Sequence, residues 1–315
     1  MLTEFADYVT YRLLKLEPTS HLGDALNFFI YDTIKIFLLL TTIVYAVAVI
    51  RAYFPPEKTK RILSHKKEFI GNIMAALLGI VTPFCSCSAI PLFIGFVEAG
   101  IPLGVTFSFL ISSPMVNEVA LIMLWGLFGW KIALIYTGTG VVLAIVSGII
   151  IGRLKMEKYV QDYVWTIKAE NAEIVQTSFR DKLIYARDYT VELLKRIWPY
   201  VTIGIGLGGF VHGYVPMDFV VNYAGPANPF AVLVAVLIGI PLYSSAAGMI
   251  PVVQALVGKG MAMGTVLAFM MSVTAISFPE AVILKNVLKM RLIYTFFGIV
   301  AIGIIIVGYL FNSIL

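Results

Sequence analysis

Long apolar stretches alternate with short polar ones along the chain, and their lengths predict helices that cross a membrane. A bilayer core about 30 Å thick requires roughly 20 apolar residues in a spanning helix. Six stretches reach or approach that length: Phe28–Ile50, Pro102–Leu127, Ile132–Ile151, Ile197–His212, Met261–Leu284 and Leu292–Leu310. The pattern therefore predicts an all-α polytopic membrane protein with six spans.

Two further apolar stretches, Phe69–Val97 and Phe230–Val257, are interrupted at their centres. The interruptions read TPFCSCSAIP at Thr82–Pro91 and IPLYSSAAGMIP at Ile240–Pro251. Proline removes a helical N–H donor, and the arms on either side, about ten residues each, are too short to cross a bilayer. We therefore expect each stretch to form a re-entrant hairpin, which brings the total to eight hydrophobic segments.

The second half of the chain repeats the first. Gly79-Ile80 matches Gly239-Ile240, 160 positions later, and Ile90-Pro91 matches Ile250-Pro251. In the same register Gly100, Gly104, Phe109 and Ser112 match Gly260, Gly264, Phe269 and Ser272, and after a small gap Leu134–Thr137 matches Leu292–Thr295. Repeats that contain broken helices are typical of secondary transporters, whose substrate site lies near the midplane of the membrane.

Lys and Arg gather in three loops, at residues 51–67, 153–196 and 285–291, and such loops favour the cytoplasmic side. All three share that side only if the interrupted stretches are re-entrant, because an even number of spans then separates each pair of loops. The first repeat would start outside and the second inside, so the repeats are predicted to be inverted. The alternative is a parallel repeat of four full spans each, which would place the central linker outside.

This pattern divides the chain into four regions. Residues 1–27 are predicted to form an interfacial N-terminal helix, because apolar side chains recur there at helical spacing on a charged stretch. Residues 28–152 form the first transmembrane repeat, 153–189 a cytoplasmic amphipathic linker, and 190–315 the second transmembrane repeat.

Composition supports the membrane class and excludes several others. Hydrophobic residues make up 60% of the 315 and charged residues 13%, against roughly 45–50% and about 25% in soluble proteins. The net charge of +5 is small and lies in loops, which argues against nucleic-acid binding. Motifs of metalloproteases, P-loop nucleotide sites and serine hydrolases are absent from the sequence, so we expect no enzyme and no cofactor.

We expect a multi-pass protein of the cytoplasmic membrane. Its expected partners are the lipid bilayer and a small-molecule or metalloid substrate, and a homo-oligomer would be compatible with this.

The two cysteines of the chain, Cys85 and Cys87, lie at the tip of the first predicted hairpin. Thiolates are soft ligands, and two at this spacing can bind one soft metal or metalloid centre where the backbone is not regular helix. Monomethyl arsenic(III) has two exchangeable positions and is satisfied by two thiols, whereas inorganic arsenite would require a third sulfur. The alternative is that the cysteines are small buried hydrophobes. The second hairpin carries Ser245 and Ala247 at the matching positions.

Three segments, TPFCSCSAIPL, SSPMVNE and SFPEA, resemble the ArsP-type permease family, whose described members export trivalent organoarsenicals. The similarity covers both repeats. The resemblance implies a multispanning inner-membrane exporter in which Cys85 and Cys87 engage the metalloid.

In two of the predicted spans an acidic residue follows a break. Glu118 follows the Ser112–Pro114 break beside Asn117, and Glu280 follows Ser277-Phe278-Pro279. A charge at the bilayer centre costs at least about 2.5–3.5 kcal/mol, so such residues are functional candidates. We expect proton coupling through Glu118 and Glu280; the alternative is that they cap broken helices or pair with Lys285. Further candidates for substrate binding share small polar side chains near the breaks: Ser86, Ser88, Ser244, Ser245 and Asn117.

Overall fold

The computed structural model describes residues 2–18, 20–53, 68–81, 86–98, 100–116, 118–161, 179–214, 228–242, 244, 246–285 and 287–315. The regular secondary structure of these residues is helical. Within these residues the only β-pairing is an isolated bridge between Val160 and Leu288. The helices of the first half are α1 (Leu2–Asp7), a π-helical turn (Tyr8–Leu13), α2 (His21–Tyr53), α4 (Glu68–Val81), α5 (Ser86–Glu98), α6 (Leu103–Met115), α7 (Glu118–Phe128) and α8 (Trp130–Arg153). A 3₁₀ turn (Glu157–Tyr159) follows, and then α10 (Phe179–Tyr214), α12 (Ala231–Gly239), α13 (Ala246–Gly258), α14 (Met263–Ala275), α15 (Phe278–Leu284) and α16 (Met290–Ile314).

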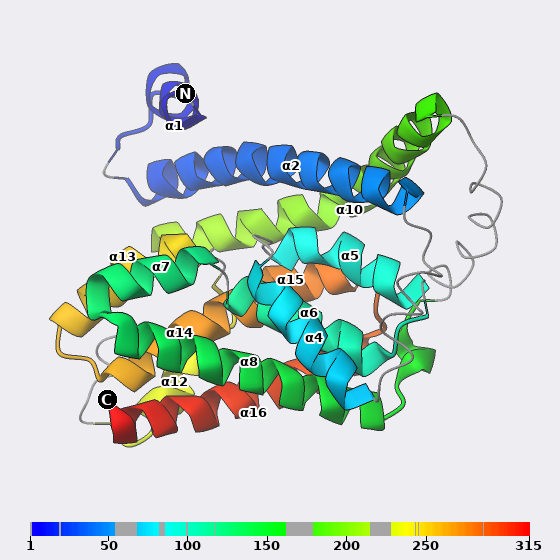
Figure 1. Ribbon diagram of the computed structural model, residues 1–315. Helices are drawn as coiled ribbons and strands as arrows, with labels where there is room; N and C mark the ends of the chain where they lie inside the picture. The colour runs from blue at the N-terminus through cyan, green and yellow to red at the C-terminus, as the bar shows by residue number, and fades with distance from the viewer. Residues whose placement is uncertain are drawn as a thin grey trace.

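Helices α2 and α10 run side by side in opposite directions along one edge of the molecule (Figure 1). Helices α8 and α16 lie at the other edge and also run in opposite directions. The shorter helices fill the space between these two pairs. Of these, α5 packs against α2, and α15 packs against α10. The long helices therefore flank a central layer of broken ones.

Among the described residues, three helical stretches are long and apolar enough to cross a membrane: Trp130–Arg153, Met263–Leu284 (α14 together with α15) and Met290–Ile314. A fourth candidate is the pair Leu103–Met115 and Ala120–Phe128, which is bent by 44°. These four coincide with four of the six predicted spans. The other two, Phe28–Ile50 and Ile197–His212, lie within α2 and α10. The prediction of an all-α integral membrane protein is thereby confirmed.

Four helices of the first half start 160 residues before four helices of the second half. Helices α5 and α13 correspond at both ends, as do α6 and α14; α7 and α15 correspond at their starts, as do α8 and α16. Gly100 and Gly260, also 160 apart, both adopt positive φ, at 75° and 86°. The small gap expected before Leu292 does not appear in the helix boundaries, so Tyr136 corresponds to Phe296.

In both predicted hairpins the second helix begins earlier than the sequence predicted. Helix α5 begins at Ser86 and α13 at Ala246, so Pro91 and Pro251 lie inside these helices. The arms that the structure describes, α4, α5, α12 and α13, have 14, 13, 9 and 13 residues. At 1.5 Å per residue, even 14 residues reach only about 21 Å, well short of a bilayer core.

Glycines allow the helices of each half to cross at close range. A Cβ on Gly104 would lie 2.5 Å from the Gly148 carbonyl oxygen, and a Cβ on Gly264 would lie 2.5 Å from that of Gly308. Small residues at such crossings are how membrane helices gain packing contacts in the absence of a hydrophobic driving force. In the first half, the Ser108 hydroxyl also donates to Asn72 Oδ1 at 2.7 Å. The helices that cross at these glycines are therefore tightly packed against each other.

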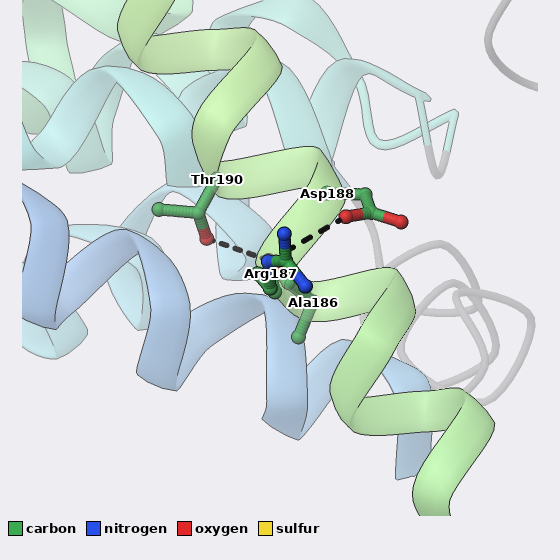
Figure 2. A network of polar contacts seen from close by, with 4 residues as sticks. All are labelled: Ala186, Arg187, Asp188 and Thr190. Atoms are coloured by element: carbon green, nitrogen blue, oxygen red, sulfur yellow. Dashed lines mark hydrogen bonds and ion pairs between the residues drawn. The ribbon is translucent and has the colours of Figure 1, made fainter.

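The described part of the predicted 153–189 linker includes the start of α10. This helix begins at Phe179, inside the predicted linker. Figure 2 shows its polar contacts: the Thr190 hydroxyl donates to the Ala186 carbonyl oxygen at 2.6 Å, and Arg187 lies 4.0 Å from Asp188. Both charged side chains are largely exposed, so this pair contributes little stability. Residues 162–178 lie outside the described part of the chain.

Candidate functional site

The broken helices α6–α7 and α14–α15 place polar groups inside the apolar core. Helix α6 ends with the Val116 N–H donating to the Ser112 carbonyl oxygen at 2.8 Å, and α14 ends with the Ile276 N–H donating to that of Ser272 at 3.1 Å. Pro114 lies inside α6 near its end. Broken helices of this kind are tolerated at membrane depth only where protein or a water-filled cavity surrounds the freed backbone groups.

Two serines tie the first arm of each hairpin to the broken helix beside it. The Ser112 hydroxyl donates to the Ala76 carbonyl oxygen at 2.7 Å, and the Ser272 hydroxyl donates to that of Val236, also at 2.7 Å. Gly79 and Gly239 permit this contact, because a Cβ on either would lie 2.9 Å from the Cβ of Ser112 or Ser272. The alignment of the two halves of the sequence matched Ser112 with Ser272 but did not indicate the role of either serine.

The break in the second hairpin is joined directly to the start of α15. The Phe278 N–H donates to the Ile240 carbonyl oxygen at 2.6 Å. Ser277, which precedes α15, is fully buried, and its hydroxyl has no hydrogen-bond partner among the described residues. Ser244, one of the predicted binding residues, lies between α12 and α13 and is partly buried. Polar groups are therefore present, and partly buried, at the junction of this break with α15.

In the first half, the end of α6 is held by Tyr136. Its hydroxyl donates to the Met115 carbonyl oxygen at 3.1 Å, and the side chain is fully buried. Tyr136 was not among the predicted site residues. Its place inside an apolar helix gives no sequence signal that separates it from a core aromatic residue.

Both predicted carboxylates lie in the first turns of the half-helices that follow the breaks. Glu280, the third residue of α15, is fully buried; no other Asp, Glu, Lys, Arg or His is fully buried among the described residues. Glu118 is the first residue of α7 and is partly buried, and its Oε2 is buried without a hydrogen-bond partner in the described part of the chain. In the register of 160, Glu118 corresponds to Phe278, so the two carboxylates occupy similar but not identical positions.

The remaining predicted site residues cannot be placed in this way. Cys85, Asn117 and Ser245 lie outside the described residues. Ser86, Cys87 and Ser88 are the first three residues of α5, of which only the backbone is described. Among the side chains that are described, no group of three His, Cys, Asp or Glu could hold a metal ion. The assignment of the two thiols to a soft centre therefore stays a prediction.

Contacts between the halves bring the two hairpins and the two broken helices together. Helix α5 of the first half packs on α15 of the second, and α13 of the second packs on α7 of the first. Helices α6 and α14 also touch, as do α8 and α16. Helices α5 and α13 thus each lie against the carboxylate-bearing helix of the other half of the chain.

Comparison with known proteins identifies relatives over most of the chain. A family model described as a predicted permease of the ArsP type matches residues 21–313. A UPF0718 protein of Methanocaldococcus jannaschii is 23% identical over 308 aligned residues, which cover 80% of this chain and 84% of that protein. A Streptococcus mutans protein, named for membership of a two-component membrane permease complex, is 24% identical and covers 82% of this chain and 84% of its own. The UPF0718 protein YraQ of Escherichia coli is 22% identical, with 83% and 73% covered. No solved structure matches the chain significantly.

Proposed function

The chain belongs to the ArsP family of predicted permeases, and we propose that it is a secondary transporter that exports trivalent organoarsenicals across the cytoplasmic membrane. The observation that carries this proposal is that α5 and α13 each pack against a half-helix of the opposite repeat, α15 and α7 respectively. Broken helices whose half-helix ends meet near the midplane are how secondary transporters bind small solutes. The test is flux of methylarsenite through the purified protein in liposomes.

The proposed solute ligands are Cys85 and Cys87. The second hairpin supports a role for them beyond folding: α13 begins at the position that corresponds to the start of α5, although Ser245 and Ala247 replace the cysteines. A hairpin of this shape therefore does not need thiols. Two thiolates match the two exchangeable positions of a monomethyl arsenic(III) centre, which favours an organoarsenical over inorganic arsenite.

A second candidate is a permease for another small solute or anion, in which the cysteines are structural. The Streptococcus mutans relative, whose name places it in a two-component permease complex, favours the related idea that this chain works with a second subunit. A role in membrane assembly is a weaker candidate, because it does not explain why both halves of the chain contain a broken helix.

The architecture proposed for this transporter is a pair of inverted repeats with six spans and two re-entrant hairpins. It is supported by the constant separation of 160 residues between corresponding helices and by the opposite directions of α8 and α16 (Figure 1). The exchange of contacts between repeats, α5 with α15 and α13 with α7, also fits a two-fold relation.

This topology predicts a labelling pattern. Cysteines introduced at Lys60, Asn171 and Asn222, in a background that lacks Cys85 and Cys87, are treated with an impermeant maleimide in intact cells. Lys60→Cys and Asn171→Cys should be protected because their loops are basic and cytoplasmic, whereas Asn222→Cys should be labelled. Permeabilised cells, in which all three should react, provide the control. If one of Lys60→Cys and Asn171→Cys is labelled and the other is protected, the hairpins are not re-entrant. The alternative topology with four full spans per repeat would then hold.

A further inference from the structure

The segment that follows α8 pairs with the turn between α15 and α16, which joins the two repeats. Val160 and Leu288 form an antiparallel bridge and are both fully buried. The Gln161 N–H donates to the Val287 carbonyl oxygen at 2.8 Å, and the Lys289 N–H donates to that of Tyr159 at 2.7 Å. The chain reaches this position because Lys155, just after α8, adopts a left-handed conformation with φ 49°.

Side chains reinforce this pairing on its exposed side. The Arg291 guanidinium donates to the Tyr159 hydroxyl at 3.4 Å and lies 6.0 Å from the ring centroid. The hydrogen bond from Arg291 lowers the pKa of Tyr159 below its ordinary value. The Lys289 ammonium donates to the Lys158 carbonyl oxygen at 3.3 Å. These bonds are long and bring several cations close together, so the contact can be broken readily.

The corresponding turn of the first repeat is built differently. Residues 125–128, which correspond to residues 285–288, continue α7 up to Phe128, whereas α15 ends four residues earlier in this register, at Leu284. The bridge thus takes the place of the last turn of α15. Within the described residues no second bridge exists, and the α7–α8 turn ends in Gly129 with φ 87°.

The pairing fixes the half-helix that carries Glu280. Lys285 directly follows the last residue of α15, and its carbonyl oxygen accepts a hydrogen bond from the Gln161 side chain at 3.5 Å. Helix α15 in turn lies against α10 and against α5, the helix whose first turn contains Cys87. A contact that holds the end of α15 therefore also holds α15 over the first hairpin.

We propose that residues 156–161 form a cytoplasmic latch, which holds α15 against α5 and must open before a solute can reach the first hairpin from the cytoplasm. The proposal rests on the transport function proposed above. In transporters with inverted repeats the inward-open and outward-open states are reached by rocking or gating one repeat against the other around the site. A latch on one half alone makes these states unequal, and it stabilises the state in which α15 covers α5.

The latch can be weakened by removing a single backbone donor. Gln161→Pro deletes the N–H that bonds to Val287, and Val160, with φ −78° and ψ 146°, already has the conformation that a following proline requires. Gln161→Ala is the matched control, because it keeps the N–H. The readout is the rate at which an impermeant maleimide, added to the cytoplasmic face of inside-out vesicles, alkylates Cys85 and Cys87. We expect Gln161→Pro to react roughly two- to tenfold faster than Gln161→Ala, the change that loss of one hydrogen bond produces.

The opposite change locks the latch. Val160 and Leu288 form a non-hydrogen-bonded pair, whose Cα atoms lie about 4.5 Å apart, within the range of a disulfide. Oxidised Val160→Cys/Leu288→Cys should be alkylated at Cys85 and Cys87 several-fold more slowly than the same protein after reduction, with peptide mass spectrometry identifying which thiols reacted. If Gln161→Pro does not fold, this disulfide experiment tests the latch in its place.

Equal alkylation rates in the loosened and control proteins, or in the locked and reduced proteins, would overturn the latch. Neither rate requires a transported solute. A failure of the latch is therefore distinguishable from a failure of the proposed transport, in which methylarsenite would not move while the alkylation rates still responded.

Discussion

Replacing Glu280 with glutamine is expected to abolish pH-dependent transport while leaving the protein folded. Glu280 is fully buried in the first turn of α15, beside the junction of that helix with the second hairpin. Glutamine keeps the size and the hydrogen-bonding atoms of the side chain but cannot take up and release a proton. Because a charge at the bilayer centre costs at least about 2.5–3.5 kcal/mol, we expect protonation of Glu280 to change the relative stability of the states of the transporter.

Glu118→Gln should act in the same direction. Glu118 is only partly buried, but one of its carboxylate oxygens is buried without a hydrogen-bond partner among the described residues. Glu192→Gln, an exposed position on α10, is the matched control and should behave like the wild type. The measurement is the initial rate of flux in liposomes as a function of pH. If Glu280→Gln and Glu118→Gln both keep the full rate and pH dependence of the wild type, the carboxylates are structural.

Replacing either Cys85 or Cys87 with serine is expected to cost nearly as much transport as replacing both. A soft centre held by two thiolates loses the advantage of chelation when one is removed, because the remaining ligand must bind alone. The expected loss for each single variant is at least about tenfold, which corresponds to roughly 1.4 kcal/mol of binding free energy. Since thiolates are the ligands, binding should also release protons and strengthen as the pH rises.

The matched control for the cysteine variants is Ala247→Ser, which places a serine at the position of the second hairpin that corresponds to Cys87. This variant should transport like the wild type. Binding of methylarsenite to the purified variants, followed by arsenic analysis, and resistance of cells that express them provide the measurements. Transport by Cys85→Ser/Cys87→Ser at the wild-type rate would contradict a thiol site for the metalloid. The protein would then be a permease for another solute.

Features governed by local pattern could be predicted from the sequence. The all-helical membrane class follows from apolar length, and the breaks near Pro114 and Pro279 follow from proline, which cannot continue the helical hydrogen bonds. Glu118 and Glu280 stood out because an acidic residue in an apolar stretch is rare. The hairpin arms began earlier than expected, at Ser86 and Ala246, since proline at the sixth residue removes only one helical bond.

Features governed by long-range contact could not be predicted. The serine that binds Ala76 lies 36 residues from it, and the latch joins Gln161 to Lys285, 124 residues apart. Nothing in the charged loop around Lys158 indicates a β-bridge, because its pairing depends on where α15 ends. Tyr136 likewise acquires its role only when α8 lies beside the end of α6.

The most direct test of the transport function is the flux of methylarsenite through the purified wild-type protein reconstituted in liposomes. The protein should move the arsenical across the bilayer in proportion to the amount reconstituted, and the compound should be recovered chemically unchanged. Liposomes that contain Cys85→Ser/Cys87→Ser should show only the leak of protein-free liposomes. Flux through folded wild-type protein that does not exceed this leak, or arsenical recovered in a chemically altered form, would contradict a permease for thiophilic solutes.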